Sequence, residues 1–527
     1  MKAYKYIISL AALLLTVASC SEDTMDRINK NEGNPEAKIT DARFSLTDGI
    51  VASVFTANCG NLAWYVSSYT EQLFGTGNNQ LRRAELRDPI ETAGSTTFNN
   101  EWNGIYLNLK NLQAATDKCQ PGGINEGDKD LLPMCQVLSA YNWGILTDLF
   151  GDIPCTEALS SMQPKVDKQK DVYDRIFSLL DSAIVNGQIA LDEGATGVGS
   201  QDLLFKGDVN QWIGLAHALK ARYKLHLYGR DNSVLQTVID EANTAIDYGF
   251  NGAELKIFDG VAQYNPWFAY MDSRYYTGSS STVANLMQER NDPREAAYNF
   301  DFMGANTLAD PGNAELAGLT YVVNAPLWLA NSAAPAHLFS KAELYFILAE
   351  AKQRLGEEFM TDFETAVRAS MADFDTAENL TSEMKDYMWG ADPGYVSPFE
   401  IPGQNGAGEM ISILDEVATD YLNRINDRLQ QDPLAEIMVQ KYLAQSRDEQ
   451  LETYNDIRRC MYVDKKYYVT LTNPKNKNGA GANRWPLSLP YGNSDVLSNP
   501  NVKALFGSGN DAGTYIFTKN VWWAGGE

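Results

Sequence analysis

The chain has 527 residues, of which 44% are hydrophobic, 11% aromatic and 21% charged, a composition typical of folded globular proteins rather than disordered or fibrous ones. Its formal net charge of -25 would repel a polyphosphate, so we expect no nucleic-acid partner. Only His217, His226 and His337 are present, which leaves little room for a histidine-based metal cluster or a histidine general base. We therefore expect no metal and no cofactor.

The N-terminus has the pattern of an exported lipoprotein. Lys2 and Lys5 precede an apolar stretch from Tyr6 to Val17, which is shorter than the roughly 20 residues that a membrane-spanning helix needs. Val17-Ala18-Ser19-Cys20 resembles a bacterial lipobox, in which the cysteine is acylated before cleavage. The alternative is an ordinary secretory signal that happens to end near a cysteine.

These features predict three parts of the chain. We expect a lipoprotein signal peptide at residues 1–19, a flexible tether at 20–38 lipidated on Cys20, and one domain at 39–527. Two or more acyl chains would anchor the mature protein stably to a membrane. Ser21-Glu22-Asp23 resembles the signal that sends some lipoproteins to the outer face of an outer membrane, which predicts an outer-membrane, lipid-anchored protein that faces the cell exterior.

Helical periodicity dominates the rest of the chain. Apolar residues recur at steps of three and four from Val172 to Ile184 and from Trp212 to Leu227. The same spacing predicts further helices near 40–58, 62–74, 98–118, 128–150, 233–248, 338–349, 359–372, 408–430, 432–447 and 451–461. Alternation over Tyr467–Leu471 predicts a small β-hairpin. We expect an all-α fold with tetratricopeptide-like helix pairs and a loop-rich face, although no clean 34-residue repeat is present.

The remaining cysteines are Cys59, Cys119, Cys135, Cys155 and Cys460. No two of them have the C-x-x-C spacing of a zinc site, and a chain of this length does not need disulfides. We expect buried free thiols.

Three segments lack the helical period, at about 251–336, 388–408 and from 473 to the C-terminus. Seven aromatic residues lie within Phe258–Tyr276 alone. Aromatic planes pack on the apolar faces of sugar rings, and amide or guanidinium groups pair with hydroxyls, although peptides offer similar partners. The alternative is that these aromatic residues fasten the loops to the helical body.

Several blocks, in order along the chain, resemble the SusD/RagB family of outer-membrane nutrient-binding lipoproteins. The most specific is Asp148-Leu149-Phe150-Gly151-Asp152-Ile153-Pro154, which follows a predicted helix. Others are Asp292-Pro293-Arg294, Ala349-Glu350-Ala351, Gln440-Lys441-Tyr442 with Arg458-Arg459, and Arg484-Trp485-Pro486. In these blocks the glycine, the proline and the aspartates suit turns and helix caps, so we expect structural roles rather than catalytic ones.

The resemblance implies a cell-surface lipoprotein that binds oligosaccharides and passes them to a SusC-like TonB-dependent outer-membrane transporter, acting as its lid. The alternative is the same architecture with oligopeptide ligands. A more distant alternative is a secreted glycosidase with paired carboxylates, but no catalytic motif is present and we expect no enzyme. As ligand platforms the sequence indicates Tyr264, Trp267, Tyr275, Tyr276 and Trp328, and as hydrogen-bonding partners Asn78, Arg82 and Arg274. Asn78 and Arg82 are chosen because early loops often join the binding face in that family.

Overall fold

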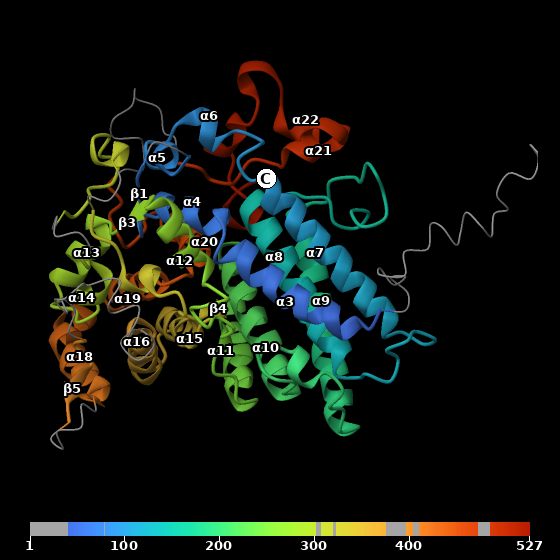
Figure 1. The fold of residues 1–527 in the computed structure, drawn as a ribbon, viewed down its shortest axis with the longest axis horizontal. Coiled ribbons are helices and arrows are strands. Elements are labelled where there is room, and N and C mark those ends of the chain that lie inside the picture. The colour runs from blue at the N-terminus through green and yellow to red at the C-terminus, as the bar shows by residue number, and fades with distance from the viewer. Residues whose placement is uncertain are drawn as a thin grey trace, which may run out of the picture.

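Long α-helices make up the body of the molecule (Figure 1). The structure is a computed structural model that describes residues 40–77, 80–301, 307–319, 323–375, 397–403, 410–472 and 485–527. Its longer helices are α3 (Ala42–Ala57), α4 (Asn61–Tyr69), α7 (Asn99–Lys118), α8 (Leu131–Phe150), α9 (Gln169–Asp192), α10 (Val209–His226), α11 (Val234–Asp247), α15 (Lys341–Leu355), α16 (Met360–Phe374), α18 (Leu414–Gln431), α19 (Pro433–Gln445) and α20 (Gln450–Val463). None of the helices in these ranges is both long and apolar enough to cross a membrane.

Local sequence signals set where several helices begin and end. The side chain of Asp41 accepts a hydrogen bond from the Arg43 amide at the start of α3, and Ser340 does the same for Glu343 in α15. Helix α8 ends where Gly151 has a φ of 81°, which favours glycine. The predicted aspartate–aromatic–glycine turn after a long helix is therefore present.

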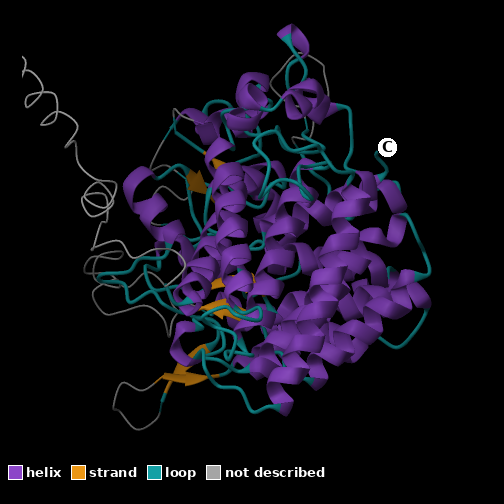
Figure 2. Cartoon of the chain, turned by 90° about the vertical axis from the view of Figure 1, so that its right-hand side faces the viewer, coloured by secondary structure: helices purple, strands orange, loops and turns teal. Residues whose placement is uncertain are grey.

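Long helices pack as pairs that follow one another across the molecule. The pairs are α3 with α7, α8 with α9, α10 with α11, and α15 with α16, and each lies against the next through α7–α8, α9–α10 and α11–α15. Figure 2 shows these helices filling one side of the molecule, while many loops and the short strands lie on the other. The prediction of an all-α fold with tetratricopeptide-like pairs is confirmed.

The strands are short and form three antiparallel pairs. They are β1 (Phe74–Gly75) with β3 (Thr277–Gly278), β2 (Ala253–Leu255) with β4 (Ala336–Phe339), and β5 (Glu400–Pro402) with β6 (Met410–Ser412). The strand expected at Tyr467–Leu471 is wrong, because this segment is a loop. Within it only Val469 is buried, and the amide of Thr472, just beyond the segment, donates to the Glu71 side chain instead of to a strand.

The aromatic-rich segment near 251–336 is less irregular than expected. It contains the short helices α12 (Pro266–Arg274), α13 (Ser281–Gln288) and α14 (Glu295–Tyr298), and the 3-10 turns η3 (Leu316–Gly318) and η4 (Leu327–Ala330). Other short helices are α5 (Gln80–Glu85), α6 (Pro89–Thr92), α21 (Asn493–Ser498) and α22 (Pro500–Phe506), and η8 (Trp522–Ala524) is a 3-10 turn. Most of the second irregular stretch, 388–408, lies outside the described residues.

The core joins parts of the chain that are far apart in sequence. The side-chain amide of Gln72 donates to the Tyr442 carbonyl at 2.9 Å and to the Thr453 hydroxyl at 2.8 Å, and the Trp485 indole donates to the Tyr69 carbonyl. The prediction of buried free thiols is confirmed for Cys59, Cys119, Cys135, Cys155 and Cys460, while Cys20 lies outside the described residues.

Candidate ligand-binding face

Backbone hydrogen bonds bring the loop after β1 beside the aromatic segment. Strands β1 and β3 pair, and the Thr76 amide donates to the Tyr276 carbonyl at 2.8 Å. The Gly77 amide donates to the Leu319 carbonyl at 3.0 Å, which ties in the segment that follows η3. Three segments that are distant in sequence, around 74–77, 275–278 and 316–319, therefore lie side by side.

A stack of aromatic rings lies at this face. Trp64 of α4 stacks on Tyr270 of α12 with ring centroids 3.8 Å apart, and Tyr276 meets Tyr270 edge-on at 6.3 Å. Trp64 and Tyr276 are half-buried, and Arg274, one helical turn after Tyr270, is exposed. We call Trp64, Tyr270, Arg274 and Tyr276 the aromatic face.

The polar edges of the aromatic face are not satisfied by the protein. Among the residues that the structure describes, the Trp64 indole nitrogen, the Tyr270 hydroxyl and one Glu101 carboxylate oxygen have no hydrogen-bond partner. Asn61, one turn before Trp64 on α4, donates to the other oxygen of Glu101 at 3.0 Å. Burial, together with the Tyr276 hydroxyl, raises the pKa of Tyr270, so its hydroxyl keeps its proton. These atoms are themselves buried, so the accessible part of the aromatic face consists of the half-buried rings of Trp64 and Tyr276 and the exposed Arg274 guanidinium, which suit a ligand with apolar faces and hydroxyls.

Two of the predicted platforms lie in the core instead of on this face. Trp267 is 0% exposed and Trp328 1%, with their rings edge-to-face at 5.2 Å. The Trp267 indole donates to the Asn58 carbonyl at 2.8 Å, and the Arg447 guanidinium covers the Trp328 ring. Neither tryptophan presents an open ring, so for these two the alternative interpretation holds: they fasten the loops to the helical body.

The other predicted residues are spread more widely. Tyr275 is half-buried at the end of α12, directly before Tyr276, and the half-buried Arg82 lies against Gly318. Tyr264 is 47% exposed and packs on Phe268 near the start of α12, whereas Tyr275 follows the end of this nine-residue helix, which is about 13 Å long at 1.5 Å per residue. Asn78 lies outside the described residues.

Trp64 and Tyr270 were not among the predicted contacts. Both sit in helices, and the sequence argument looked for contacts in the loops. The spacing of Asn61 and Trp64, three residues apart in α4, places an amide beside a ring on one helix face and could have indicated the site.

A separate cavity of about 590 Å³ opens beside the turn that ends α8. Its lining includes Lys168, Tyr491, Tyr515, Lys519 and Trp522. None of the predicted ligand residues lines it. Because this cavity is lined by both rings and charges, an experiment on ligand binding has to distinguish it from the aromatic face.

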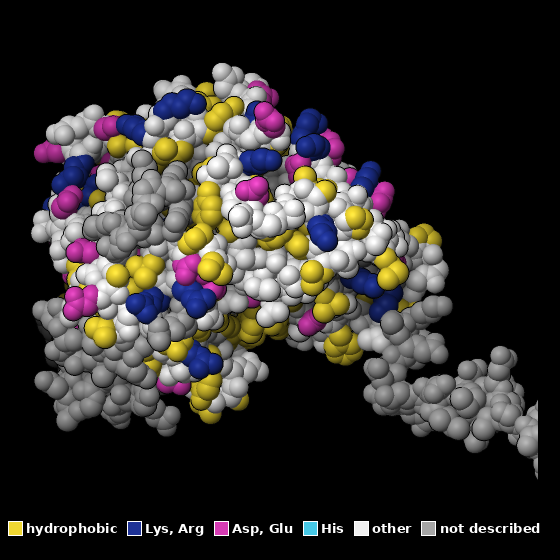
Figure 3. Space-filling model, turned by 90° about the horizontal axis from the view of Figure 1, so that it is seen from above, with side chains coloured by type: hydrophobic (Ala, Val, Ile, Leu, Met, Phe, Trp, Pro, Cys, Tyr) yellow, Lys and Arg dark blue, Asp and Glu magenta, His cyan; other side chains and the backbone are white. Residues whose placement is uncertain are grey.

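Charge is distributed without a dominant sign over the part of the surface seen from above. Figure 3 shows basic and acidic side chains interspersed there, with apolar side chains between them. Among the described residues seen in this view, the acidic side chains form no extended patch that would account for ligand recognition.

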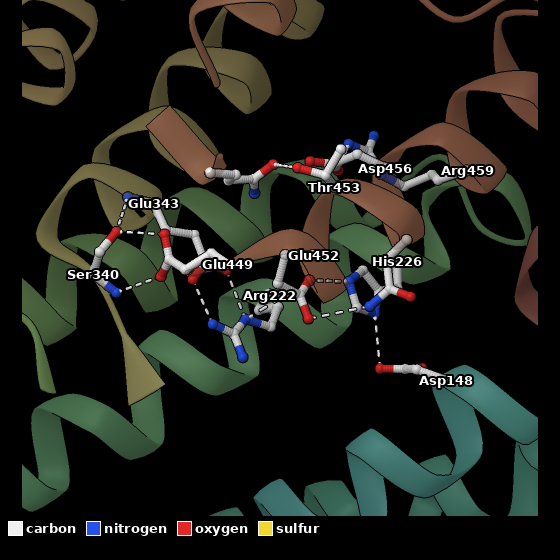
Figure 4. Close-up of polar contacts among 12 residues, drawn as sticks. Asp148, Arg222, His226, Ser340, Glu343, Glu449, Glu452, Thr453, Asp456 and Arg459 are labelled. Carbon is white, nitrogen blue, oxygen red and sulfur yellow. Dashed lines mark hydrogen bonds and ion pairs between the residues drawn. The ribbon is translucent and has the colours of Figure 1, made fainter. Parts of the chain in front are cut away.

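The strongest concentration of titratable groups is buried (Figure 4). Arg222 of α10 forms an ion pair with Glu343 of α15, and His226 lies between Glu452 of α20 at 3.0 Å and Asp148 of α8 at 3.4 Å. Burial alone would lower the pKa of His226, but these two carboxylates outweigh it and raise the pKa to about 9. Since the cluster is enclosed by helices, it joins them rather than meeting a ligand.

The predicted family blocks contribute many of these buried pairs. Arg459 pairs with Glu350 at 2.6 Å, and Arg294 with Asp292 at 2.6 Å. Asp152 accepts from the Gln169 amide near the start of α9, as expected of a capping aspartate. Asp148 instead accepts from side chains, those of Tyr173 and Trp523. The structural roles expected for these blocks agree with this arrangement.

Comparison with known proteins identifies the fold family. Residues 90–464 match the family model SusD-like_2, described as "Starch-binding associating with outer membrane". A solved SusD/RagB family protein from Bacteroides thetaiotaomicron shares 32% sequence identity, with a TM-score of 0.76, over 93% of this chain and 100% of the other. The chain belongs to the SusD/RagB family.

More distant SusD/RagB structures share the same fold. A SusD homologue from Bacteroides fragilis is 18% identical, with a TM-score of 0.65, over 92% of this chain and 99% of its own. A chitin-binding SusD homologue from Flavobacterium johnsoniae is 18% identical, with a TM-score of 0.59, over 91% and 98%. A search of curated proteins finds no match. SusD/RagB proteins associate with the outer membrane, which gives this chain its general location.

Proposed function

We propose that this protein binds oligosaccharides at the aromatic face and passes them to a SusC-like TonB-dependent outer-membrane transporter, over which it acts as a lid. The observation that carries the proposal is the Trp64–Tyr270–Tyr276 stack, whose outer rings are half-buried, with the exposed Arg274 beside it. Sugar rings supply apolar faces for such rings and hydroxyls for the guanidinium. Starch binding in the family description and chitin binding in a structural neighbour favour glycans over peptides.

In this proposal the mature protein begins at Cys20, whose acyl chains hold it on the outer surface of the membrane, with residues 20–38 as the tether and residues 39–527 as the binding domain. Replacement of Cys20 by alanine is then expected to release the protein from the membrane fraction. Copurification of the lipidated chain with a TonB-dependent barrel would support the transporter as partner.

Ligand binding is tested by calorimetry on a chain that lacks residues 1–20, with starch and chitin oligosaccharides and a set of peptides as ligands. We expect Trp64→Ala to weaken glycan binding at least about tenfold, the equivalent of about 1.4 kcal/mol, because it removes the half-buried tryptophan at one end of the stack. Arg274→Ala, at an exposed position that leaves the core intact, is expected to weaken it as well.

Trp522→Ala is the matched control, since Trp522 is also half-buried but lines the other cavity. If this substitution weakens glycan binding and Trp64→Ala does not, the aromatic face is not the site. Capture of peptides with no binding to any glycan would support the oligopeptide alternative. Release of reducing ends from a bound oligosaccharide would support the glycosidase alternative.

A further inference from the structure

Three potential metal ligands meet at the edge of the β2–β4 pair. Glu254 of β2 lies opposite His337 of β4 in the strand register, and Asp373 comes from the last turn of α16. The His337 Nε2 atom lies 3.5 Å from a Glu254 oxygen and 3.6 Å from an Asp373 oxygen. One ligand atom of each residue lies within 4.8 Å of the other two.

These separations fit a metal better than they fit direct hydrogen bonds. A good N–H···O hydrogen bond spans about 2.7–3.2 Å, which is shorter than both distances. Two ligand atoms that share a tetrahedral zinc ion, each about 2.0–2.1 Å from it, lie roughly 3.3 Å apart. The two nitrogen–oxygen distances are thus slightly longer than the distance between two ligand atoms on one zinc ion.

The imidazole is also oriented in the way that metal-binding histidines are. His337 Nδ1 lies 2.8 Å from an oxygen of the buried Asp448, which therefore accepts its proton and directs Nε2 toward the two carboxylates. Arg447 pairs with the second oxygen of Asp448 and balances its charge. A carboxylate behind the imidazole is the usual support of a histidine ligand, and its loss typically costs 10–100-fold in metal affinity.

We propose that Glu254, His337 and Asp373 bind a divalent transition-metal ion, with zinc as the best fit. The imidazole nitrogen disfavours Ca²⁺ and Mg²⁺, which prefer oxygen ligands. The carboxylate side chains are 26% and 21% exposed, so the fourth position opens to solvent and takes a water. Lys256 pairs with the other oxygen of Glu254 and leaves the facing one available.

The ion would link the β2–β4 strand pair to the last turn of α16. It would thus join three segments that are separated along the chain by 83 residues (254 to 337) and 36 residues (337 to 373). The expectation of no metal site rested on the small number of histidines. Here one histidine suffices because carboxylates supply the remaining ligands.

The test uses tag-free protein without residues 1–20, stripped with EDTA and titrated with ZnCl₂ by calorimetry, with melting temperature as a second measurement. We expect about one zinc per chain and a higher melting temperature. Asp373→Asn, at a half-exposed position, and His337→Gln should each weaken zinc binding at least tenfold, and Asp448→Asn, at the supporting residue, by about 10–100-fold.

His217→Gln is the matched control, because His217 faces one carboxylate, Glu241, instead of two and is expected to leave zinc binding unchanged. CaCl₂ and MgCl₂ should produce no comparable heat or stabilisation. Failure of the stripped wild type to bind zinc would overturn the proposal, as would zinc binding that is unchanged in Asp373→Asn and His337→Gln. Anomalous scattering at the zinc edge should place the ion among the three side chains.

Discussion

The buried His226 predicts a pH dependence of stability that can be worked out from its surroundings. Asp148 and Glu452 face it from α8 and α20, the Tyr173 hydroxyl lies 3.0 Å from its Nδ1, and the Trp523 ring stacks on it at 5.1 Å. The folded state thus holds the imidazolium between two carboxylates, a condition that the unfolded chain lacks.

The sign and size follow from the pKa of His226. That pKa is raised from 6.5 to about 9 on folding, so the charged imidazole stabilises the fold fully below pH 6.5, and this stabilisation is lost as the pH rises through 9. At 1.36 kcal/mol per pKa unit, the loss amounts to about 3 kcal/mol. Nearly all of it should be gone by about pH 9.5.

The assay compares wild type with His226→Gln by urea unfolding from pH 6 to 9.5, followed by tryptophan fluorescence and far-UV circular dichroism. EDTA in all samples removes any contribution from the proposed metal site. At pH 6 the variant should be less stable, and the difference in free energy of unfolding should shrink by about 3 kcal/mol toward pH 9.5. Gln236→Ala, at an exposed position on α11, should keep the wild-type pH profile. A wild-type-minus-variant difference that stays constant over this range would refute the reasoning.

Other substitutions test the packing and the buried pairs by the same unfolding assay. Gly144→Ala would place a methyl group 2.1 Å from the hydroxyl oxygen of the buried Tyr223, and should destabilise the protein by about 1–3 kcal/mol. Gly104→Ala in α7, whose nearest neighbouring atom would be 4.0 Å away, should instead stabilise by about 0.5–1 kcal/mol; equal effects of the two would contradict the packing described. Glu350→Gln leaves buried basic groups without their counter-charge and should cost about 3–5 kcal/mol, whereas the exposed Glu357→Gln should change stability by less than about 0.5 kcal/mol.

The long helices could be predicted because their packing leaves a periodic signal in the sequence. The apolar positions from Trp212 to Leu227 anticipated α10, and those from Val172 to Ile184 anticipated α9. The same pattern gives no sign that Arg222, a charged residue in this helix, is buried, yet it is. Its partner Glu343 lies 121 residues further along the chain, and periodicity within one helix carries no information about such a partner.

The candidate site was predictable in region but less so in its residues. The concentration of aromatic residues in the sequence indicated the segment around α12, and in the structure rings of this segment contact one another and Trp64. Whether a given ring faces the solvent or the core depends on what packs against it, so Trp267 and Tyr270 are buried while Tyr264, on the same segment, is 47% exposed. The metal ligands were missed for a related reason: Glu254, His337 and Asp373 share no local motif, and only the strand pairing and α16 bring them together.

The hydrogen bonds of Gln72 have a consequence for how the chain reaches its native state. They join α4 and the residues after it to partners 370 and 381 positions further along, so the contacts that complete this part of the core close very long loops. Chains rich in such non-local contacts fold slowly, because the entropy of loop closure is lost before the contacts form. The N-terminal helix pairs should therefore stay incompletely ordered on their own, and a fragment that ends before α19 should expose the apolar surface that the later helices cover.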